Sequence, residues 1–140
     1  MNDLNRFIQA QEADFPIALS EIKNGRKKSH WMWYIFPQIK GLGLSQTSIY
    51  YAISDIEEAE NYLNHPILGS RLIEISNELL KLDSKDALSI FGSPDDLKLK
   101  SSMTLFSQIE KTNPVFQLVL DRFFKGEKDK QSMQIIKGFN

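Results

Sequence analysis

The stretch SPDDLKLKSSMTLFSQIE, residues 93–110, opens with a strong helix-start signal and predicts a helix that runs to its end. Ser93 can cap the helix, and Pro94 suits its first turn. Asp95 and Asp96 then place negative charge at the positive end of the helix dipole. Comparable start and stop signals recur along the chain, and together they predict an all-α fold.

Upstream of this stretch, the pattern predicts two helices before Gly25. The first follows Asp3, a good N-cap, and carries apolar residues at helical spacing. The second begins near Asp14, with Pro16 in its first turn, and ends at Gly25.

Further helices are predicted from apolar spacing, caps and terminating glycines. The run 48–53, SIYYAI, resembles a strand but is short and has no hairpin turn beside it. We therefore expect a compact single domain over residues 1–140, with seven to nine helices, several of them short. The remaining expected segments are 31–36, a short element from Ser45 or Thr47, 56–65, a helix from Pro66, 86–92, 114–125 and 130–139.

The composition is that of an ordinary globular domain and excludes several classes of protein. The chain has 140 residues, a formal net charge of -1 and no cysteine. These values exclude disulfides, thiolate nucleophiles and cysteine-ligated zinc, and they give no overall basic field for nucleic acid. We expect no membrane partner, because no run approaches the ~18 apolar residues of a membrane span. A start without signal-peptide features and the lack of cysteine fit a cytoplasmic protein, and we expect no metal and no cofactor.

The segment KKSHWMWYIFPQIKGLGLSQ, residues 27–46, gathers aromatic side chains between a basic triplet and a glycine turn. On a helix, Trp31 and Ile35 would share one face, whereas Trp33 would point elsewhere. The favoured interpretation is a buried core helix. The alternative is the wall of a ligand pocket, which the polar side chains of His30 and Gln38 would help to form.

Two neighbouring motifs have structural interpretations that we favour. Arg26, Lys27 and Lys28 could contact phosphates, but three cations in a connector are common on any surface, so nucleic acid is an unlikely partner. The glycine turn at residues 41–45 matches neither a Walker motif nor a dinucleotide fingerprint, and a structural turn explains it.

Residues 98–104, KLKSSMT, combine lysines and hydroxyls beside an apolar stripe. Lys98 and Ser102 stand four residues apart and can meet on one helix face, as a Ser–Lys nucleophile pair would require. Hydroxyls in a helix also commonly bond back to its own carbonyls. A ligand role for this patch and a local role both remain open.

Of the two histidines, His30 is the better candidate for a general base, because it lies beside the aromatic segment and titrates near neutral pH. His65 lies at a helix end, where a cation is favourable. Asp95 and Asp96 would need to face a partner across a cleft to act as paired glycosidase carboxylates.

The blocks SHWMWYIFPQIKGLG, YAISDIEEAENYLNHPILGSRL, IFGSPDDLKLKSSMTLF and FFKGEKD resemble the family called domain of unknown function 1810. Its members are small, mostly bacterial proteins that are sometimes mislabelled calpastatin. The resemblance covers nearly the whole chain and implies a compact all-α domain with no established activity. It also implies that a polar signature falls on His30, Trp31, Gln38, Ser45, Tyr51, Lys98, Ser101, Ser102 and Thr104.

Three functional hypotheses follow. The first is a pocket that binds a small anionic ligand or a nucleotide, and that could belong to a metal-independent hydrolase or glycosidase with His30 as its base. The second is a non-catalytic protein-interaction module with an apolar patch around Phe123, Phe124 and Phe139. The third, nucleic-acid binding through the basic triplet, ranks last, and the oligomeric state is left open.

Overall fold

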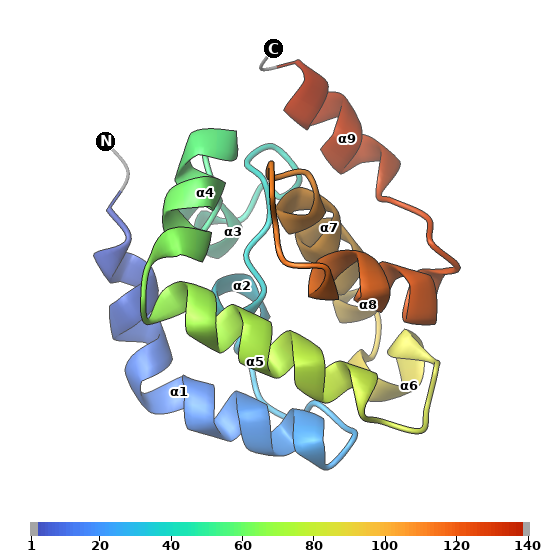
Figure 1. Ribbon diagram of the computed structural model, residues 1–140. Coiled ribbons are helices and arrows are strands. Elements are labelled where there is room, and N and C mark those ends of the chain that lie inside the picture. Colours follow the sequence, from blue (N-terminus) through green and yellow to red (C-terminus); the bar gives the residue numbers. More distant parts are fainter. Residues whose placement is uncertain (1–2, 139–140) are drawn as a thin grey trace.

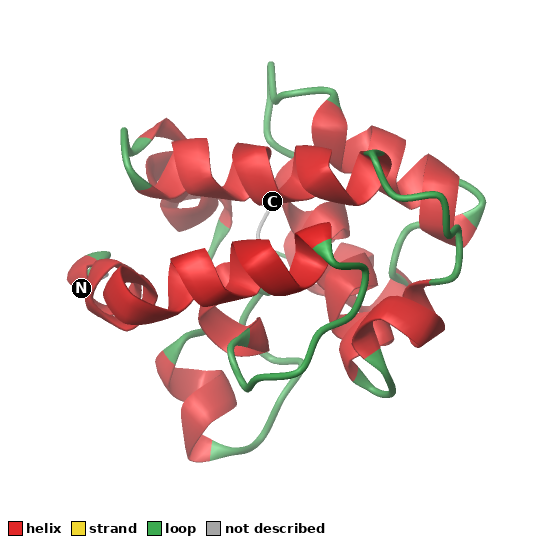
Figure 2. Cartoon of the chain, turned by 90° about the horizontal axis from the view of Figure 1, so that it is seen from below, coloured by secondary structure: helices red, strands yellow, loops and turns green. Residues whose placement is uncertain are grey.

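The structure is a computed structural model that describes residues 3–138. Within that range the chain forms nine helices and no strand, which confirms the predicted all-α fold. Figure 2 shows the helices joined by loops and turns. A single parallel β-bridge joins Ile39 to Ile53. The helices are α1 (Asn5–Lys23), α2 (Met32–Ile35), α3 (Gln46–Tyr50), α4 (Ile56–Asn64), α5 (Leu68–Leu80), α6 (Ala87–Phe91), α7 (Asp95–Ser107), α8 (Val115–Phe124) and α9 (Lys130–Lys137).

The two helices predicted before Gly25 are one helix, α1, so that prediction was wrong. Pro16 lies inside α1 and cannot donate a hydrogen bond to the carbonyl of Glu12. Both residues are exposed, so water can solvate that carbonyl and the helix continues. In Figure 1, α1 changes direction along its length, as a helix with an internal proline commonly does.

Several predicted helix starts have side-chain caps, but the predicted Ser93 cap is wrong, because Pro94 is the N-cap residue of α7 and no side chain of the described residues caps that helix. The carboxylate of Asp55 accepts a hydrogen bond from the backbone of Glu58 at 2.8 Å. Asp86, Asp129 and Ser45 cap α6, α9 and α3 in the same way. These bonds satisfy N–H groups that have no partner within a helix. The final helix stops at Lys137, and residue 139 of its predicted range lies outside the described residues.

The helices pack around α5 and α7. As Figure 1 shows, α1 and α5 lie side by side, and α5 also contacts α4 and α8. Helix α7 contacts α4, α6, α8 and α9, while α2 packs against α1. One cluster of buried apolar side chains joins residues from eight of these helices, all but α3.

Helix α7 is surrounded by protein over most of its length. Leu99 and every residue from Ser101 to Phe106 are buried. Phe106 contacts Tyr62 and Phe116, with ring centroids 5.5 and 5.6 Å apart. The hydroxyls of the 98–104 segment therefore lie largely inside the protein.

A buried ion pair holds α1, α4 and the segment after α3 together. The Arg6 guanidinium lies 3.2 Å from the Glu58 carboxylate. It also donates to the carbonyls of Asp3, Tyr50 and Ala52 at 2.7–2.8 Å. The backbone of Ser54 donates to the same carboxylate at 2.8 Å. Arg6 and Glu58 thereby fix the course of the chain where it leaves α3.

Candidate ligand-binding site

The segment from residue 31 to residue 36 divides between core and surface. Trp31, Met32, Ile35 and Phe36 are buried, which confirms the core interpretation for these side chains. Trp33 is half-buried and projects from the single turn of α2 on the side away from the core. Its position follows from the pattern, because both apolar faces of the turn are already occupied by buried side chains.

The Trp33 ring is covered on one face by Lys98 of α7. The Lys98 ammonium lies 4.2 Å from the ring centroid, within the range of a cation–π interaction. The two residues are 65 positions apart in the sequence. Their contact brings the aromatic segment and the lysine–hydroxyl segment to one surface.

Asp95 joins two lysines at this surface. Its two carboxylate oxygens lie 2.9 Å from the Lys27 ammonium and 3.0 Å from the Lys98 ammonium. Burial acts to raise the pKa of Asp95, but the hydrogen bonds from Lys27 and Lys98 outweigh it and hold the pKa below its usual value. The side chain of Lys27 is 7% exposed and that of Lys98 is 22% exposed. Lys98 is therefore the ammonium that a ligand can reach more easily.

An open hollow of about 330 Å³ lies on one side of Trp33 and Lys98. We call it the His30 hollow. His30 and Lys27 come from the connector before α2, and Ser45 and Thr47 come from the start of α3. The lining is Lys27, His30, Met32, Trp33, Tyr34, Ser45, Thr47, Asp95 and Lys98.

A second hollow of about 230 Å³ lies on the other side and shares Trp33 and Lys98 with the first. We call it the Gln38 hollow, and the two together the Trp33 site. Its walls are mostly apolar, with the amide of Gln38 and the hydroxyl of Ser101 among them. The lining is Trp33, Gln38, Leu42, Pro94, Leu97, Lys98, Ser101, Asp129 and Gln131.

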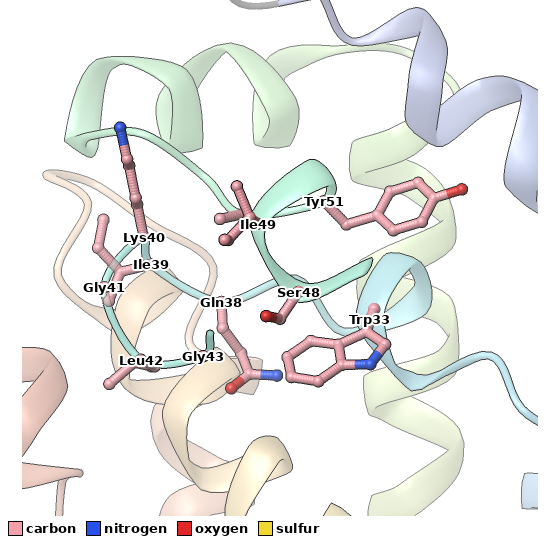
Figure 3. Close-up of a pocket in the computed structure, with 11 residues that line it drawn as sticks. Trp33, Gln38, Ile39, Lys40, Gly41, Leu42, Gly43, Ser48, Ile49 and Tyr51 are labelled. Carbon is pink, nitrogen blue, oxygen red and sulfur yellow. The ribbon is translucent and has the colours of Figure 1, made fainter. Parts of the chain in front are cut away.

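The amide of Gln38 is an unusual feature of this second hollow. Gln38 is only 6% exposed, and its Nε2 has no hydrogen-bond partner in the described part of the chain. Figure 3 shows this nitrogen beside the Trp33 ring. A buried donor without a partner costs about 1–3 kcal/mol, so this amide is a candidate contact for a ligand or for a water molecule in the small cavity beside it.

The glycine turn closes a small cavity beside Gln38. The cavity of about 20 Å³ is lined by residues of the turn together with Trp33, Gln38 and Ser48, as Figure 3 shows. Roughly 10–15 Å³ is enough for a single water molecule but not for a larger ligand. A Cβ atom on Gly43 would lie 2.6 Å from the Cβ of Ser48, so only glycine allows this close turn. A packing role accounts for this glycine, as expected of a structural turn.

His30, Gln38, Ser45, Lys98 and Ser101 line the two hollows, and the other predicted site residues do not. Trp31 is buried, and its indole nitrogen donates to Glu21 at 2.9 Å. Ser102 is fully buried, and Thr104 accepts a hydrogen bond at 2.8 Å from the backbone of Asp129. Tyr51 lines the small cavity and packs against Tyr34, with ring centroids 5.0 Å apart and ring planes tilted by 54°.

The arrangement does not provide the catalytic pairs considered from the sequence. Lys98 is directed to Asp95 and Trp33, and no hydrogen bond joins it to Ser102 among the described residues. The His30 side chain is exposed, and its ring makes no hydrogen bond within residues 3–138 that would orient it as a base. Its backbone carbonyl does accept a hydrogen bond from the Tyr34 hydroxyl at 3.2 Å.

Several residues of the site were not predicted as ligand contacts. The helical spacing predicts that Trp33 points away from the buried faces of the turn. This outward direction is the sequence signal that could have identified Trp33 as a ligand contact. Lys27 was considered only as one member of a basic triplet, and Asp95 mainly as a helix-start charge. Their ion pair depends on the packing of the connector against α7, which no local pattern reports.

The structure gives little support to the hypotheses of a protein-interaction module and of nucleic-acid binding. Phe123 and Phe124 are half-buried and pack against the core, and Phe139 lies outside the described residues. Lys27 forms an ion pair with Asp95, so the three cations of the basic triplet do not form one continuous positively charged surface. In residues 3–138 no group of three metal-ligating side chains is present, and no helix there could cross a membrane.

Comparisons with known proteins agree with the resemblance seen in the sequence. The model of the family described as "Protein of unknown function (DUF1810)" matches residues 1–136. The crystal structure of the conserved hypothetical protein Rv1873 from Mycobacterium tuberculosis superposes with a TM-score of 0.94. That protein is 41% identical, and the alignment covers 96% of each chain. No curated protein matches the chain.

Proposed function

The chain belongs to the DUF1810 family, and on that premise we propose from its own geometry that it binds a small anionic molecule at the Trp33 site. One observation carries the proposal. The contact between Lys98 and Trp33 forms a wall shared by two adjoining hollows, which contain His30 and Ser45 on one side and Gln38 and Ser101 on the other.

The composition of the walls supports binding of a small molecule. Ligand sites commonly combine an aromatic or apolar lining with a few directional polar groups. Here Trp33 supplies a flat surface, and Lys98 supplies a charge that remains partly exposed despite its ion pair. Asp95 holds that ammonium in place, so little side-chain entropy remains to be lost when a ligand binds.

The proposal is for binding rather than for a reaction. A general base needs a fixed orientation as well as a suitable pKa, and the His30 ring has no orienting partner among the described side chains. We therefore assign His30 to ligand contact in the His30 hollow, where Ser45 forms part of the wall. Hydrolysis of a glycosidic or other bond is not part of this proposal.

The proposal is tested with a panel of nucleosides, nucleotides, sugar phosphates and aromatic carboxylates. Nuclear magnetic resonance suits it, because the chain has two tryptophans and therefore two indole N–H signals. A ligand at the Trp33 site should shift the Trp33 signal and leave that of buried Trp31 nearly unchanged. A ligand present at 100 times its Kd should also raise the free energy of unfolding by roughly 2.7 kcal/mol.

Matched variants identify the site. Lys98→Met should weaken binding, whereas Lys81→Met, which changes an exposed lysine of an ion pair at the end of α5, should not. Trp33→Phe assigns the signal and should also weaken binding. A panel in which no compound shifts the Trp33 signal, or equal affinity in wild type and Lys98→Met, would refute the proposal.

A further inference from the structure

We propose that the ligand of the Trp33 site is a flat molecule with a single negative charge, such as an aromatic carboxylate, and not a nucleoside polyphosphate. This inference rests on the proposed function and narrows it to a chemical class. It depends on the balance of charges around the two hollows and on the polar groups at their ends.

The charges that line the His30 hollow nearly cancel. Lys27 and Lys98 contribute two positive charges and Asp95 contributes one negative charge, so the formal sum is +1 with neutral His30. Asp95 lies within 3.0 Å of both ammonium groups, which reduces the field that either one offers. Asp129 in the other hollow brings the formal sum over both hollows to zero, so the partly exposed Lys98 ammonium can serve one negative charge and the site has no surplus positive charge for several.

The Gln38 hollow offers no additional positive charge. Lys98 and Asp129 line it, and their formal charges sum to zero. The Asp129 carboxylate accepts two hydrogen bonds from Ser132 at 2.6 and 2.9 Å and is thereby fixed as the cap of α9. A phosphate chain that extended from Lys98 into this hollow would meet that carboxylate.

The usual means of binding phosphate chains are also missing from the described lining. Neither hollow is lined by an arginine, whose fork-shaped guanidinium suits phosphate oxygens. Helix α3, which begins at the His30 hollow, has only five residues. The hydroxyl of its N-cap residue, Ser45 Oγ, already accepts a hydrogen bond from the backbone N–H of Ser48 at 3.1 Å. The site is therefore poorly suited to more than one phosphate.

The remaining groups fit a flat body with a neutral polar end. Trp33, Leu42 and Leu97 form apolar walls of the Gln38 hollow. The Gln38 amide, nine-tenths buried and without a partner for Nε2 in the described chain, can exchange hydrogen bonds with a carbonyl or hydroxyl group. We assign Lys98 to the charged end of the ligand and Gln38 to its uncharged polar end.

The test compares matched probes by resonance titration of the Trp33 indole signal. The first pair is indole-3-acetate and indole-3-acetamide, and the second is 4-hydroxyphenylacetate and its amide. The third set is adenosine, AMP and ATP. Each carboxylate should bind about tenfold more tightly than its amide, a difference of about 1.4 kcal/mol, because only the carboxylate can pair with the Lys98 ammonium. Lys98→Met should remove that difference, and Lys81→Met should retain it.

Gln38→Met provides a second arm that does not depend on charge. This variant keeps the backbone bond in which Ile53 donates to the Gln38 carbonyl at 2.8 Å, so the fold should be retained. We expect weaker binding of 4-hydroxyphenylacetate at an undiminished melting temperature. Unchanged affinity would overturn the role given to Gln38.

The outcomes separate this inference from the proposed function. Binding that shifts Trp33, depends on Lys98 and strengthens from adenosine to AMP to ATP would overturn the single-charge inference and retain the site. Equal affinity for carboxylates and amides would also overturn it. If no probe shifts the Trp33 signal, both the inference and the proposed function fail.

Discussion

The indole nitrogen of Trp31 donates a hydrogen bond to Oε1 of Glu21 at 2.9 Å, and this bond ties a buried aromatic side chain to the end of α1. The same carboxylate accepts bonds from the backbones of Lys28 and Ser29 at 2.7 and 3.0 Å and from the Ser29 hydroxyl at 2.6 Å. Glu21 therefore holds the whole connector that carries Lys27 and His30 to the Trp33 site.

Glu21 should make the stability of the protein depend on pH. Burial acts to raise the pKa of Glu21, but the hydrogen bonds from Ser29, Lys28 and Trp31 outweigh it and lower the pKa from 4.5 to about 2. Because the folded pKa is depressed, the stabilisation is fully present above about pH 4.5 and is lost as the pH falls towards about 2. Glu21→Gln keeps an acceptor without a charge and should give a flatter profile, measured by urea unfolding from pH 6 to pH 3. Identical pH profiles would contradict this.

The ion pair of Arg6 and Glu58 should be costly to break on one side only. The Glu58 side chain is 1% exposed and that of Arg6 is 12% exposed. Arg6→Met leaves a buried carboxylate without its counter-charge, so we expect a loss of about 3–5 kcal/mol in the free energy of unfolding.

The double variant with Glu58→Met should lose less than the sum of the two single variants, since it leaves no unpaired charge. Urea unfolding followed by circular dichroism measures all four forms. Additive losses would show that the two side chains are not coupled.

Gln11 and Gln38 form a natural comparison of buried amides. The Gln11 amide donates to the Tyr34 carbonyl at 2.7 Å and to the Tyr62 hydroxyl at 2.8 Å, whereas Nε2 of Gln38 has no partner in the described residues. Gln11→Met should lower the free energy of unfolding by about 2 kcal/mol, because the Tyr34 carbonyl and the Tyr62 hydroxyl would lose this hydrogen-bond partner. Gln38→Met should leave it unchanged or raise it. Equal losses would mean that the Gln38 amide has a structural partner.

Gly69 should be essential for the close packing of α5 against the end of α4. A Cβ atom at this position would lie 1.8 Å from the carbonyl oxygen of Leu63, and a backbone atom cannot rotate away. We expect Gly69→Ala to cost about 3 kcal/mol in thermal or urea unfolding.

Gly138→Ala is the control, because its Cβ would lie 3.3 Å from the nearest oxygen and its φ of -67° suits any residue. A Gly69→Ala protein as stable as this control would show that the backbone can shift to make room.

The family, the all-α class and most helix ends could be predicted from the sequence, because each depends on neighbours within a few residues. Asp55 caps the start of α4, and Gly92, with a φ of 75°, ends α6; both effects involve only nearby residues. The exceptions were the Ser93 cap of α7 and α1, in which the pattern predicted a new helix from near Asp14 with Pro16 in its first turn. The helix continues because Glu12 and Pro16 are exposed to water. Which face of α1 is exposed depends on how the rest of the chain packs against it.

Only the tertiary structure decided which polar side chains share a surface. Lys98 reaches Trp33 and Asp95, whereas Ser102, four residues further along α7, is sealed inside the protein. Helical spacing states which residues share a face of one helix, but α7 is packed by neighbours on nearly every side, so its pattern does not reveal the face that stays open. That choice depends on how α9 and Trp33 of α2 pack against α7, and those contacts join residues tens of positions apart.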